Sequence, residues 1–403
     1  MARVLLLMPS TSYRASDFLK AGARLGVEVV VGSNHRPILE QFSEGRTLML
    51  HFDRLDESVT KIVEQAARRP LDGIVGVDEE TLLLAARASA KLGLPHNSEH
   101  AVADSHNKHR LRQVLERTGL KTPWYKLIDA HDDLERLAEE LDFPCVLKPL
   151  TLSASRGVIR ADNPNAFTNA GHRIRKMLEN SRFPTQLLVE QFIPGNEVAL
   201  EGLLANGQLK VLSLFDKPDP LNGPFFEETL YVTPSRLADR TQHAVREECQ
   251  LAARALGLHS GPVHAELRIN NNGPWLIELG ARTIGGLCSR SLCFTGQHTL
   301  EELVIRQVLG EPEQDYGPAV DASGVMMIPI PTAGRLRAIV GLDKARQVPG
   351  ITDVVVTIPL GETLVPLPEG ARYLGFIFCK AKRAQDVESA LRQAHRQLAF
   401  VIE

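Results

Sequence analysis

The sequence predicts an α/β N-terminal domain, followed by an α+β central domain and a small α+β C-terminal subdomain. The chain has 403 residues, which is too long for a single hydrophobic core of ordinary size. Residues 1 to about 100 alternate short apolar runs with amphipathic stretches, whereas later residues form strand-like pairs around turn residues. We therefore expect three units, which span 1–104, 105–310 and 311–403.

The N-terminal unit has the pattern of a parallel sheet with crossover helices. Short apolar runs predict strands at Val4–Met8, Val27–Gly32, Leu48–Phe52 and Gly73–Val77. Amphipathic stretches predict helices at Ala15–Leu25, Leu55–Arg68 and Glu79–Leu92. The glycine fingerprint of a dinucleotide site is missing after the first strand, where Thr11–Arg14 stand instead. Open sheets bind ligands at this edge, so Arg14 could face substrate, but we expect it to be an ordinary surface residue.

The remaining chain mixes helices with antiparallel strand pairs. Predicted helices cover Lys108–Thr118, Asn163–Asn180, Ala238–Leu256 and Ala384–Leu398. Predicted strands cover Pro144–Leu150, Gly157–Ala161, Gly324–Ile330 and Tyr373–Lys380, besides a long antiparallel stretch from Gln186 to Thr233. The Asn206-Gly207 pair predicts a hairpin within that stretch, and a second hairpin joins Val263–Ile269 to Trp275–Ala281.

The composition excludes several classes of protein. The net charge is −3 and no tract is strongly basic, so we expect no nucleic-acid partner. No apolar run approaches the ~18 residues of a membrane span, and the N-terminal run is too short for a signal peptide. The five cysteines are irregularly spaced and odd in number, which indicates free thiols. A cytoplasmic location is the expectation that follows, since free thiols persist in a reducing compartment.

The second hairpin carries the strongest concentration of chemically active side chains. Period-two alternation places small or apolar residues on one face: Ala265, Leu267, Ile269, Ile277, Leu279 and Ala281. The other face carries His264, Glu266, Arg268, Glu278 and Arg282. If Asn271–Gly273 form a three-residue loop, Glu266 lies opposite Glu278, and two such carboxylates require a cation such as magnesium between them. The alternative is a solvated strand face with Arg268 as the counter-ion.

Two further segments are suited to binding a nucleotide. An apolar strand runs into Glu190 and a turn, so its end offers backbone groups to a base edge, and Glu197 is placed to accept hydrogen bonds from ribose hydroxyls. Lys148 interrupts another apolar strand, and Ser153–Gly157 beyond it could direct backbone N–H groups at phosphates. Each segment also has an ordinary interpretation: a strand-to-turn junction for Glu190, and a lysine at a sheet edge for Lys148.

Taken in order, these segments resemble the ATP-grasp superfamily over about residues 100 to 310. The resemblance implies that Lys108 and Lys148 bind ATP phosphates under a closing loop that contains Ser155, Arg156 and Gly157. It also implies an adenine hinge at Glu190, Gln191 and Phe192, and ribose binding by Glu197. Glu266 and Glu278 would hold Mg²⁺, with Mn²⁺ as an alternative.

One departure from the superfamily pattern concerns the metal. Many members have Asn two residues after the last metal-binding Glu, whereas this chain has Gly280, so the third metal ligand is in doubt. The variant resembles amino-acid ligases that make dipeptides, including carnosine-synthase-like enzymes, as does the segment Phe225–Pro234. Glu227 and Glu228 in that segment are candidates to meet substrate or metal, or are one exposed and one inward strand residue. The stretch Arg372–Phe378 resembles the closing subdomain of biotin-carboxylase-like members.

The resemblance implies an ATP- and magnesium-dependent ligase. It would activate a small-molecule carboxylate as an acyl phosphate and join it to an amine, with amino acids as the expected substrates. Arg282, which would hold the acyl phosphate or carboxylate, and Glu228 are the expected catalytic residues. Self-association into a homodimer is left open. The alternatives are a biotin-carboxylase-like or purine-pathway ligase that uses bicarbonate, and a non-catalytic ATP-binding module.

Overall fold

The computed structural model describes residues 1–403 except 36–45, 130, 180, 182, 312–315 and 318–320. Its N-terminal domain is a parallel sheet in the order β3-β2-β1-β4, as expected from the strand–helix alternation. The strands are β1 (Arg3–Leu7), β2 (Glu28–Ser33), β3 (Thr47–Met49) and β4 (Gly73–Gly76). The helices are α1 (Ala15–Leu25), α2 (Leu55–Arg68) and α3 (Leu82–Leu92). The 3₁₀ turn η2 (Glu79–Thr81) precedes α3, so the third helix begins later than predicted.

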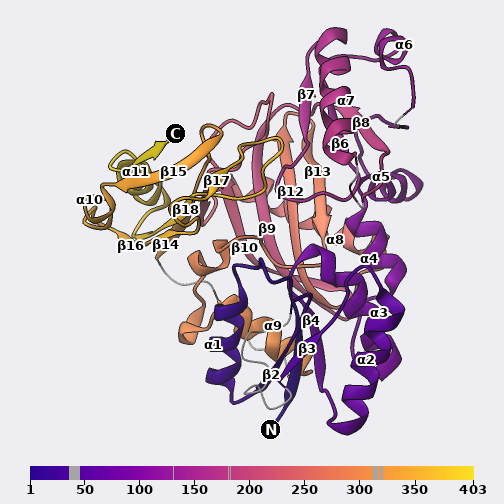
Figure 1. Ribbon diagram of the computed structural model, residues 1–403, viewed down its shortest axis with the longest axis vertical. Coiled ribbons are helices and arrows are strands. Elements are labelled where there is room, and N and C mark those ends of the chain that lie inside the picture. Colours follow the sequence, from indigo (N-terminus) through magenta and orange to yellow (C-terminus); the bar gives the residue numbers. More distant parts are fainter. Residues whose placement is uncertain (36–45, 130, 180, 182, 312–315, 318–320) are drawn as a thin grey trace.

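A second sheet of four antiparallel strands forms a lid at the top of Figure 1. Its order is β5-β8-β6-β7, with β5 (Tyr125–Ile128), β6 (Cys145–Pro149), β7 (Ile159–Ala161) and β8 (Leu187–Gln191). Two helices, α6 (Leu134–Glu139) and α7 (Pro164–Leu178), supply apolar side chains to a core with one face of this sheet. Strand alternation turns Val146, Lys148 and Glu190 to the opposite face. The predicted end of α7 at Asn180 lies outside the described residues. Helices α4 (Glu99–His106) and α5 (Lys108–Arg117) connect the N-terminal domain to the lid.

The largest element is a sheet of eight antiparallel strands in the order β13-β12-β9-β10-β11-β14-β18-β16. Its strands are β9 (Asn196–Ala205), β10 (Gln208–Lys217), β11 (Leu230–Thr233), β12 (Gly261–Asn270), β13 (Gly273–Gly280), β14 (Ala322–Ile328), β16 (Ile351–Val356) and β18 (Gly375–Ala381). The sheet thus continues across the boundary that we predicted at residue 310. The predicted hairpin turn at Asn206-Gly207 joins β9 to β10 and is confirmed.

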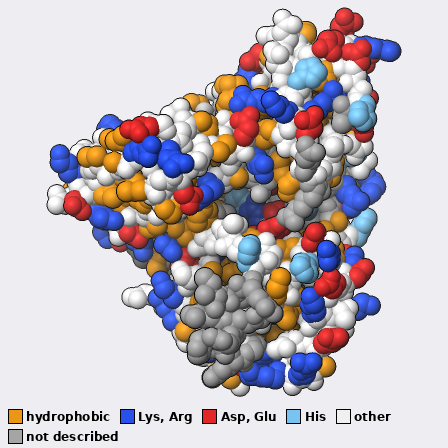
Figure 2. Space-filling model, in the orientation of Figure 1, with side chains coloured by type: hydrophobic (Ala, Val, Ile, Leu, Met, Phe, Trp, Pro, Cys, Tyr) orange, Lys and Arg blue, Asp and Glu red, His pale blue; other side chains and the backbone are white. Residues whose placement is uncertain are grey.

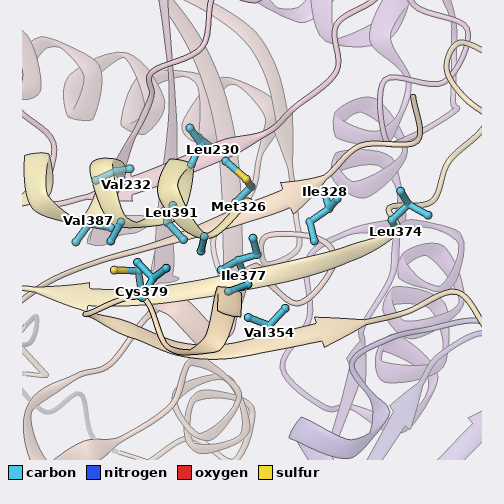
Figure 3. Packing of buried hydrophobic residues seen from close by; sticks show 14 of the residues in the cluster. Leu230, Val232, Met326, Ile328, Val354, Leu374, Ile377, Cys379, Val387 and Leu391 are labelled. Atoms are coloured by element: carbon cyan, nitrogen blue, oxygen red, sulfur yellow. The ribbon is translucent and has the colours of Figure 1, made fainter. Parts of the chain in front are cut away.

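Helices cover this sheet at both ends. Helix α8 (Asp239–Leu256) packs on β10 and β13, and α9 (Leu300–Val308) contacts α1 and β4 of the N-terminal domain. At the other end, α11 (Ala384–His395) buries Val387 and Leu391 against β14 and β18, as Figure 3 shows. The remaining C-terminal elements are α10 (Leu342–Arg346) and the small sheet of β15 (Gly334–Val340), β17 (Thr363–Leu364) and β19 (Ala399–Ile402). Two 3₁₀ turns, η3 (Cys288–Ser291) and η4 (Thr295–Gln297), lie between β13 and α9.

The β12–β13 hairpin differs in two respects from the hairpin that we predicted at Val263–Ala281. Its register pairs Glu266 with Glu278, as predicted, but the connection is not a three-residue loop. Asn270 pairs with Gly273 around a two-residue turn, and a bulge between Glu266 and Leu267 restores the register. The bulge also changes which residues face the core. Leu276 is buried there with Leu279, whereas Ile277, which we placed on the apolar face, borders the cavity described below.

Among the described residues, no helix is both long and apolar enough to cross a membrane. All five cysteines are free thiols, and four of them are buried.

Candidate active site

A cavity of about 510 Å³ lies between the N-terminal domain, the lid and the eight-stranded sheet. Figure 2 shows the molecule hollowed near its centre, with acidic and basic side chains in the hollow. Nearly every predicted site residue borders this cavity: Lys108, Lys148, Ser155, Arg156, Glu190, Gln191, Phe192, Glu197, Glu228, Glu266, Glu278 and Arg282. Gly157 is outside the lining, and its N–H donates to the Pro368 carbonyl oxygen at 2.9 Å. Residues far apart in the sequence thus converge at one place.

On the lid side, Lys148 is buried in a chain of charges. Its Nζ lies 2.5 Å from Glu190 Oε1, and Arg112 Nε donates to Glu190 Oε2 at 2.8 Å. Burial opposes ionisation of Glu190, but the two cations outweigh it and lower the pKa of this carboxyl to about 2. Burial also lowers the pKa of the Lys148 ammonium, despite the adjacent carboxylate. The Glu190 side chain is therefore engaged by Lys148 and Arg112. Arg112 was not among the predicted residues, because it is one of several charges on a basic helix.

The second predicted phosphate ligand, Lys108, opens α5 after Asn107 caps the helix. Its Nζ donates to the Leu152 carbonyl oxygen at 2.8 Å, just before the small-residue loop, and lies 3.6 Å from Glu278 Oε2. Lys108 thus links that loop to the predicted metal ligands. Within the loop, Ala154 and Ser155 have positive φ angles of 57° and 53°, which turn the backbone sharply above the cavity.

On the eight-stranded sheet, one lysine lies among three carboxylates. Lys217 Nζ is 2.8 Å from Glu197 Oε1, 2.5 Å from Glu228 Oε1 and 2.9 Å from Glu266 Oε1. One carboxylate oxygen from each of these three acids lies within 4.8 Å of the other two. Sequence reasoning missed Lys217, although a signal was available: it is the last residue of a largely apolar strand, and Lys148 was selected because it interrupts one.

The close approach of these charges moves the pKa values of Glu228 and Glu266 in opposite directions. Burial and the Glu266 carboxylate raise the pKa of Glu228 to about 7, against the pull of Lys217. For Glu266, Lys217 and His264 outweigh burial and hold its pKa well below the usual range. Tyr231 donates its hydroxyl to Glu228 Oε1 at 2.8 Å. Of this pair, Glu228 therefore holds its proton more tightly than Glu266 does.

Two further cations, Arg268 and His264, each link this cluster to a neighbouring group. Arg268, our alternative counter-ion for the acidic pair, instead donates to Glu197 Oε2 at 2.9 Å and to the Ile193 carbonyl oxygen at 3.0 Å. Our alternative interpretation, in which Arg268 is the counter-ion of Glu266 and Glu278, is therefore wrong, because Arg268 binds Glu197 and the Ile193 backbone instead. His264 pairs through Nδ1 with the buried Glu201, whose charge raises the pKa of the imidazole to about 9 even though burial opposes it.

The N-terminal domain contributes directly to the cavity. Arg282 lies two residues beyond the end of β13, so it is not on the strand face where we placed it. It pairs through Nε with Glu79 from η2, and its Nη2 lies 4.0 Å from Glu278 Oε1. Arg14 is 1% exposed, borders the cavity, and contacts Thr283 and Glu301. Our expectation of a surface role for Arg14 was wrong, because docking of α9 against α1 buries it.

Three family models match consecutive parts of the chain. They describe an ATP-grasp N-terminal domain at residues 19–96, an ATP-grasp domain at 141–291 and an L-amino acid ligase C-terminal domain 2 at 326–403. The chain is an ATP-grasp protein. The C-terminal match extends the resemblance to amino-acid ligases beyond the Gly280 variant and the segment Phe225–Pro234, on which it first depended.

Known proteins similar to this ATP-grasp protein include ligases. The L-amino acid ligase from Bacillus licheniformis has 27% identity and a TM-score of 0.82, covering 100% of this chain and 99% of that chain. Alanine–anticapsin ligase of Bacillus subtilis (strain 168) is 26% identical over 249 residues, which cover 57% of this chain. The alignment spans 52% of that relative, or about half its length. A biotin carboxylase from Campylobacter jejuni matches at 16% identity, with a TM-score of 0.69 over 99% of this chain and 92% of that chain, which shows the shared fold alone.

Proposed function

We propose that this protein is an ATP-dependent carboxylate–amine ligase that forms an amide or peptide bond between amino-acid substrates through an acyl phosphate. The observation that carries the proposal is the convergence of two lysines, a facing pair of carboxylates and an arginine on one cavity. Similarity over the whole chain to an L-amino acid ligase supports the choice of amino acids over bicarbonate. The cytoplasmic location and homodimer raised by the sequence remain predictions.

The lid would bind the nucleotide. Lys108 and Lys148 would offset phosphate charge, and Ser155 and Arg156 border the same cavity as these lysines. The N–H groups of Gln191 and Phe192 already donate to the carbonyl oxygens of Trp124 and Pro144, at 3.0 and 3.1 Å. The adenine base would therefore have to bind backbone groups of residues 190–192 other than these two N–H groups, beside the Phe192 ring.

The acidic cluster fits a divalent cation. Hard cations such as Mg²⁺ take oxygen ligands, and Glu266 supplies one beside Glu228 and opposite Glu278. We propose Glu266 and Glu278 as metal ligands, with Glu228 as the source of the third oxygen that Gly280 cannot supply. When bound, Mg²⁺ or Mn²⁺ would neutralise charge on the phosphate oxygens. Lys217 contacts both Glu228 and Glu266, so it stabilises the arrangement of these carboxylates.

The reaction would proceed in two steps on this surface. A substrate carboxylate oxygen attacks the γ-phosphorus of ATP, the bond to the β–γ bridging oxygen breaks, and ADP leaves. The amine nitrogen of the second substrate then attacks the acyl carbon, loses a proton, and displaces inorganic phosphate. Phosphoryl transfer requires positioning and charge neutralisation more than covalent help from the protein. Arg282 beside Glu278 is placed to hold the carboxylate or acyl phosphate in two parallel hydrogen bonds.

A screen of ADP and phosphate release over pairs of amino acids tests the proposal. We expect release that depends on both amino acids and on Mg²⁺, with a dipeptide detected by mass spectrometry. ADP formation that requires bicarbonate and no amino acid would favour the carboxylase-like alternative. Binding of ATP without turnover of any acid would favour a non-catalytic module.

A further inference from the structure

The position that departs from the superfamily pattern, Gly280, adjoins a side chain from another domain. A Cβ atom at residue 280 would lie 3.4 Å from Arg282 Cγ, 3.7 Å from Arg282 Nε and 3.8 Å from Glu79 Oε2. A longer side chain at residue 280 would thus extend into the space beside the Glu79 carboxylate. Glu79 therefore brings an oxygen close to where the missing Asn would project one.

Glu79 is held on two sides. Its Oε2 accepts from Arg282 Nε, and its Oε1 pairs with His106 Nδ1 at 2.9 Å. The carboxylate is largely buried, with 12% of the side chain exposed. Burial opposes its ionisation, but Arg282 and His106 outweigh burial and hold the pKa of Glu79 well below the usual range. It is therefore a fixed anion that the N-terminal domain presents to the large sheet.

The Arg282 guanidinium is fixed by this anion. In addition to the bond from Nε to Glu79, Nη1 donates to the Thr283 carbonyl oxygen at 3.0 Å. Nη2 lies towards the predicted metal ligands, 4.0 Å from Glu278 Oε1. The two anchors set the plane of the guanidinium, and this plane decides whether the group can meet a carboxylate or phosphate with two hydrogen bonds.

We propose that Glu79 is a positioning residue for ligation: it fixes Arg282 from the N-terminal domain, beside the space that the absence of a side chain at Gly280 leaves open. The proposal rests on the proposed ligase function, because Arg282 needs this orientation only if it holds a reacting group. It also gives the N-terminal domain a role in the reaction. The ATP-grasp domain alone would leave Arg282 without its main anchor.

The test compares Glu79→Ala with the double variant Glu79→Ala/Gly280→Asn in the full-length protein. Glu79→Ala should lower kcat about 10- to 100-fold, because a misplaced guanidinium loses its contact with the reacting group, while ATP affinity by calorimetry stays within about twofold. Asn at residue 280 should then recover several-fold of the lost kcat, since it enters the vacated space. Gly280 has no positive φ, so the strand backbone accepts Asn. In the wild-type background Gly280→Asn should lower kcat, because the added side chain competes with Glu79 for the same space.

Asp17→Asn is the matched control. Like Glu79, Asp17 of the N-terminal domain pairs with an arginine outside that domain. Arg290 of η3 donates from Nε and Nη2 to the Asp17 carboxylate at 2.8 and 3.1 Å. This pair does not border the cavity. If Glu79 acted only by docking the domain, Asp17→Asn would lower kcat as much as Glu79→Ala does, and the proposal would be overturned. Unchanged kcat in Glu79→Ala, or a double variant no better than Glu79→Ala, would overturn it as well.

A crystal structure of Glu79→Ala gives a readout that does not depend on turnover. We expect the Arg282 guanidinium to leave its present position, and an unmoved guanidinium would contradict the proposal. Failure of the underlying ligase function is a separate result. In that case the wild-type protein would form no product with any pair of amino acids, wherever the Arg282 guanidinium lies.

Discussion

The cavity has two lysine-centred regions with opposite charge balance. On the lid side, two cations, Lys148 of β6 and Arg112 of α5, share one carboxylate, that of Glu190. On the eight-stranded sheet, one lysine, Lys217, is surrounded by three carboxylates. The lid is therefore suited to an anion such as a triphosphate, and the sheet to a cation. A buried lysine taken alone indicates neither, since its neighbours decide which charge is in excess.

The largest effect should come from Glu278, the predicted metal ligand that pairs in register with Glu266 of the acidic region. Glu278→Gln keeps the shape of the side chain but removes one charge of the predicted metal site, so turnover should fall at least about 1000-fold, or about 4 kcal/mol. The fold should be retained, as judged by circular dichroism. ADP formation near the wild-type rate at ordinary magnesium concentrations would show that Glu278 is not a metal ligand.

Removing the lysine of the acidic region should affect stability. In Lys217→Met three carboxylates lose their common cation, so we expect the free energy of unfolding without metal to fall by about 3 kcal/mol. Magnesium should then raise the Tm of the variant more than that of the wild type, because binding to the folded state stabilises it. Lys126→Met, which loses a pair with Glu140 on the lid surface, is the control and should change little. Equal Tm values for the two variants would contradict this account.

Arg282→Lys tests the group between the two regions. The ammonium cannot reproduce two parallel hydrogen bonds, so we expect kcat to fall about 100-fold while ATP affinity is nearly normal. Calorimetry and steady-state kinetics measure the two quantities. A normal kcat would exclude Arg282 from catalysis, and lost nucleotide binding would move it to the ATP site.

The basic region should show a smaller effect, confined to the nucleotide. Lys148→Ala leaves Arg112 paired with Glu190, so the lid should fold while ATP binding or turnover weakens at least ~10-fold, or roughly 1.4 kcal/mol. Titration with ATP measures the affinity, and Lys126→Ala serves as the surface control on the same sheet. If affinity and rate are unchanged, Lys148 has a structural role only.

The smallest effect concerns pH. The pKa of Glu228 is raised from its ordinary 4.5 to about 7, so the folded state keeps a proton that the unfolded chain has released in this interval. The contribution of Glu228 to stability therefore declines as pH rises from about 4.5 to about 7. Glu228→Gln removes this dependence. In urea unfolding without divalent metal, the free energy of unfolding of the variant should rise by about 1 kcal/mol relative to that of the wild type between about pH 6.3 and about pH 8. A constant difference would contradict the raised pKa.

The sequence by itself determined the parallel N-terminal sheet, most of its strands and helices, and the Asn206-Gly207 hairpin, whereas the pairing of Glu266 with Glu278 also needs the bulge in β13. The sheet and the Asn206-Gly207 hairpin depend on local periodicity and turn residues, which the chain displays directly. The roles of the site residues remain predictions, although the structure brings nearly all of them to one cavity.

Only the tertiary structure decided which charges meet. Arg112, Lys217 and Glu79 each lie on an element whose partner is distant in the sequence, so no spacing rule could select them from the many charged residues. The bulge that turns Ile277 to the cavity and the helix packing that buries Arg14 are likewise set by neighbouring elements. The physical reason is that burial makes every charge require a partner, and the partner is chosen by packing between domains, which local sequence does not encode.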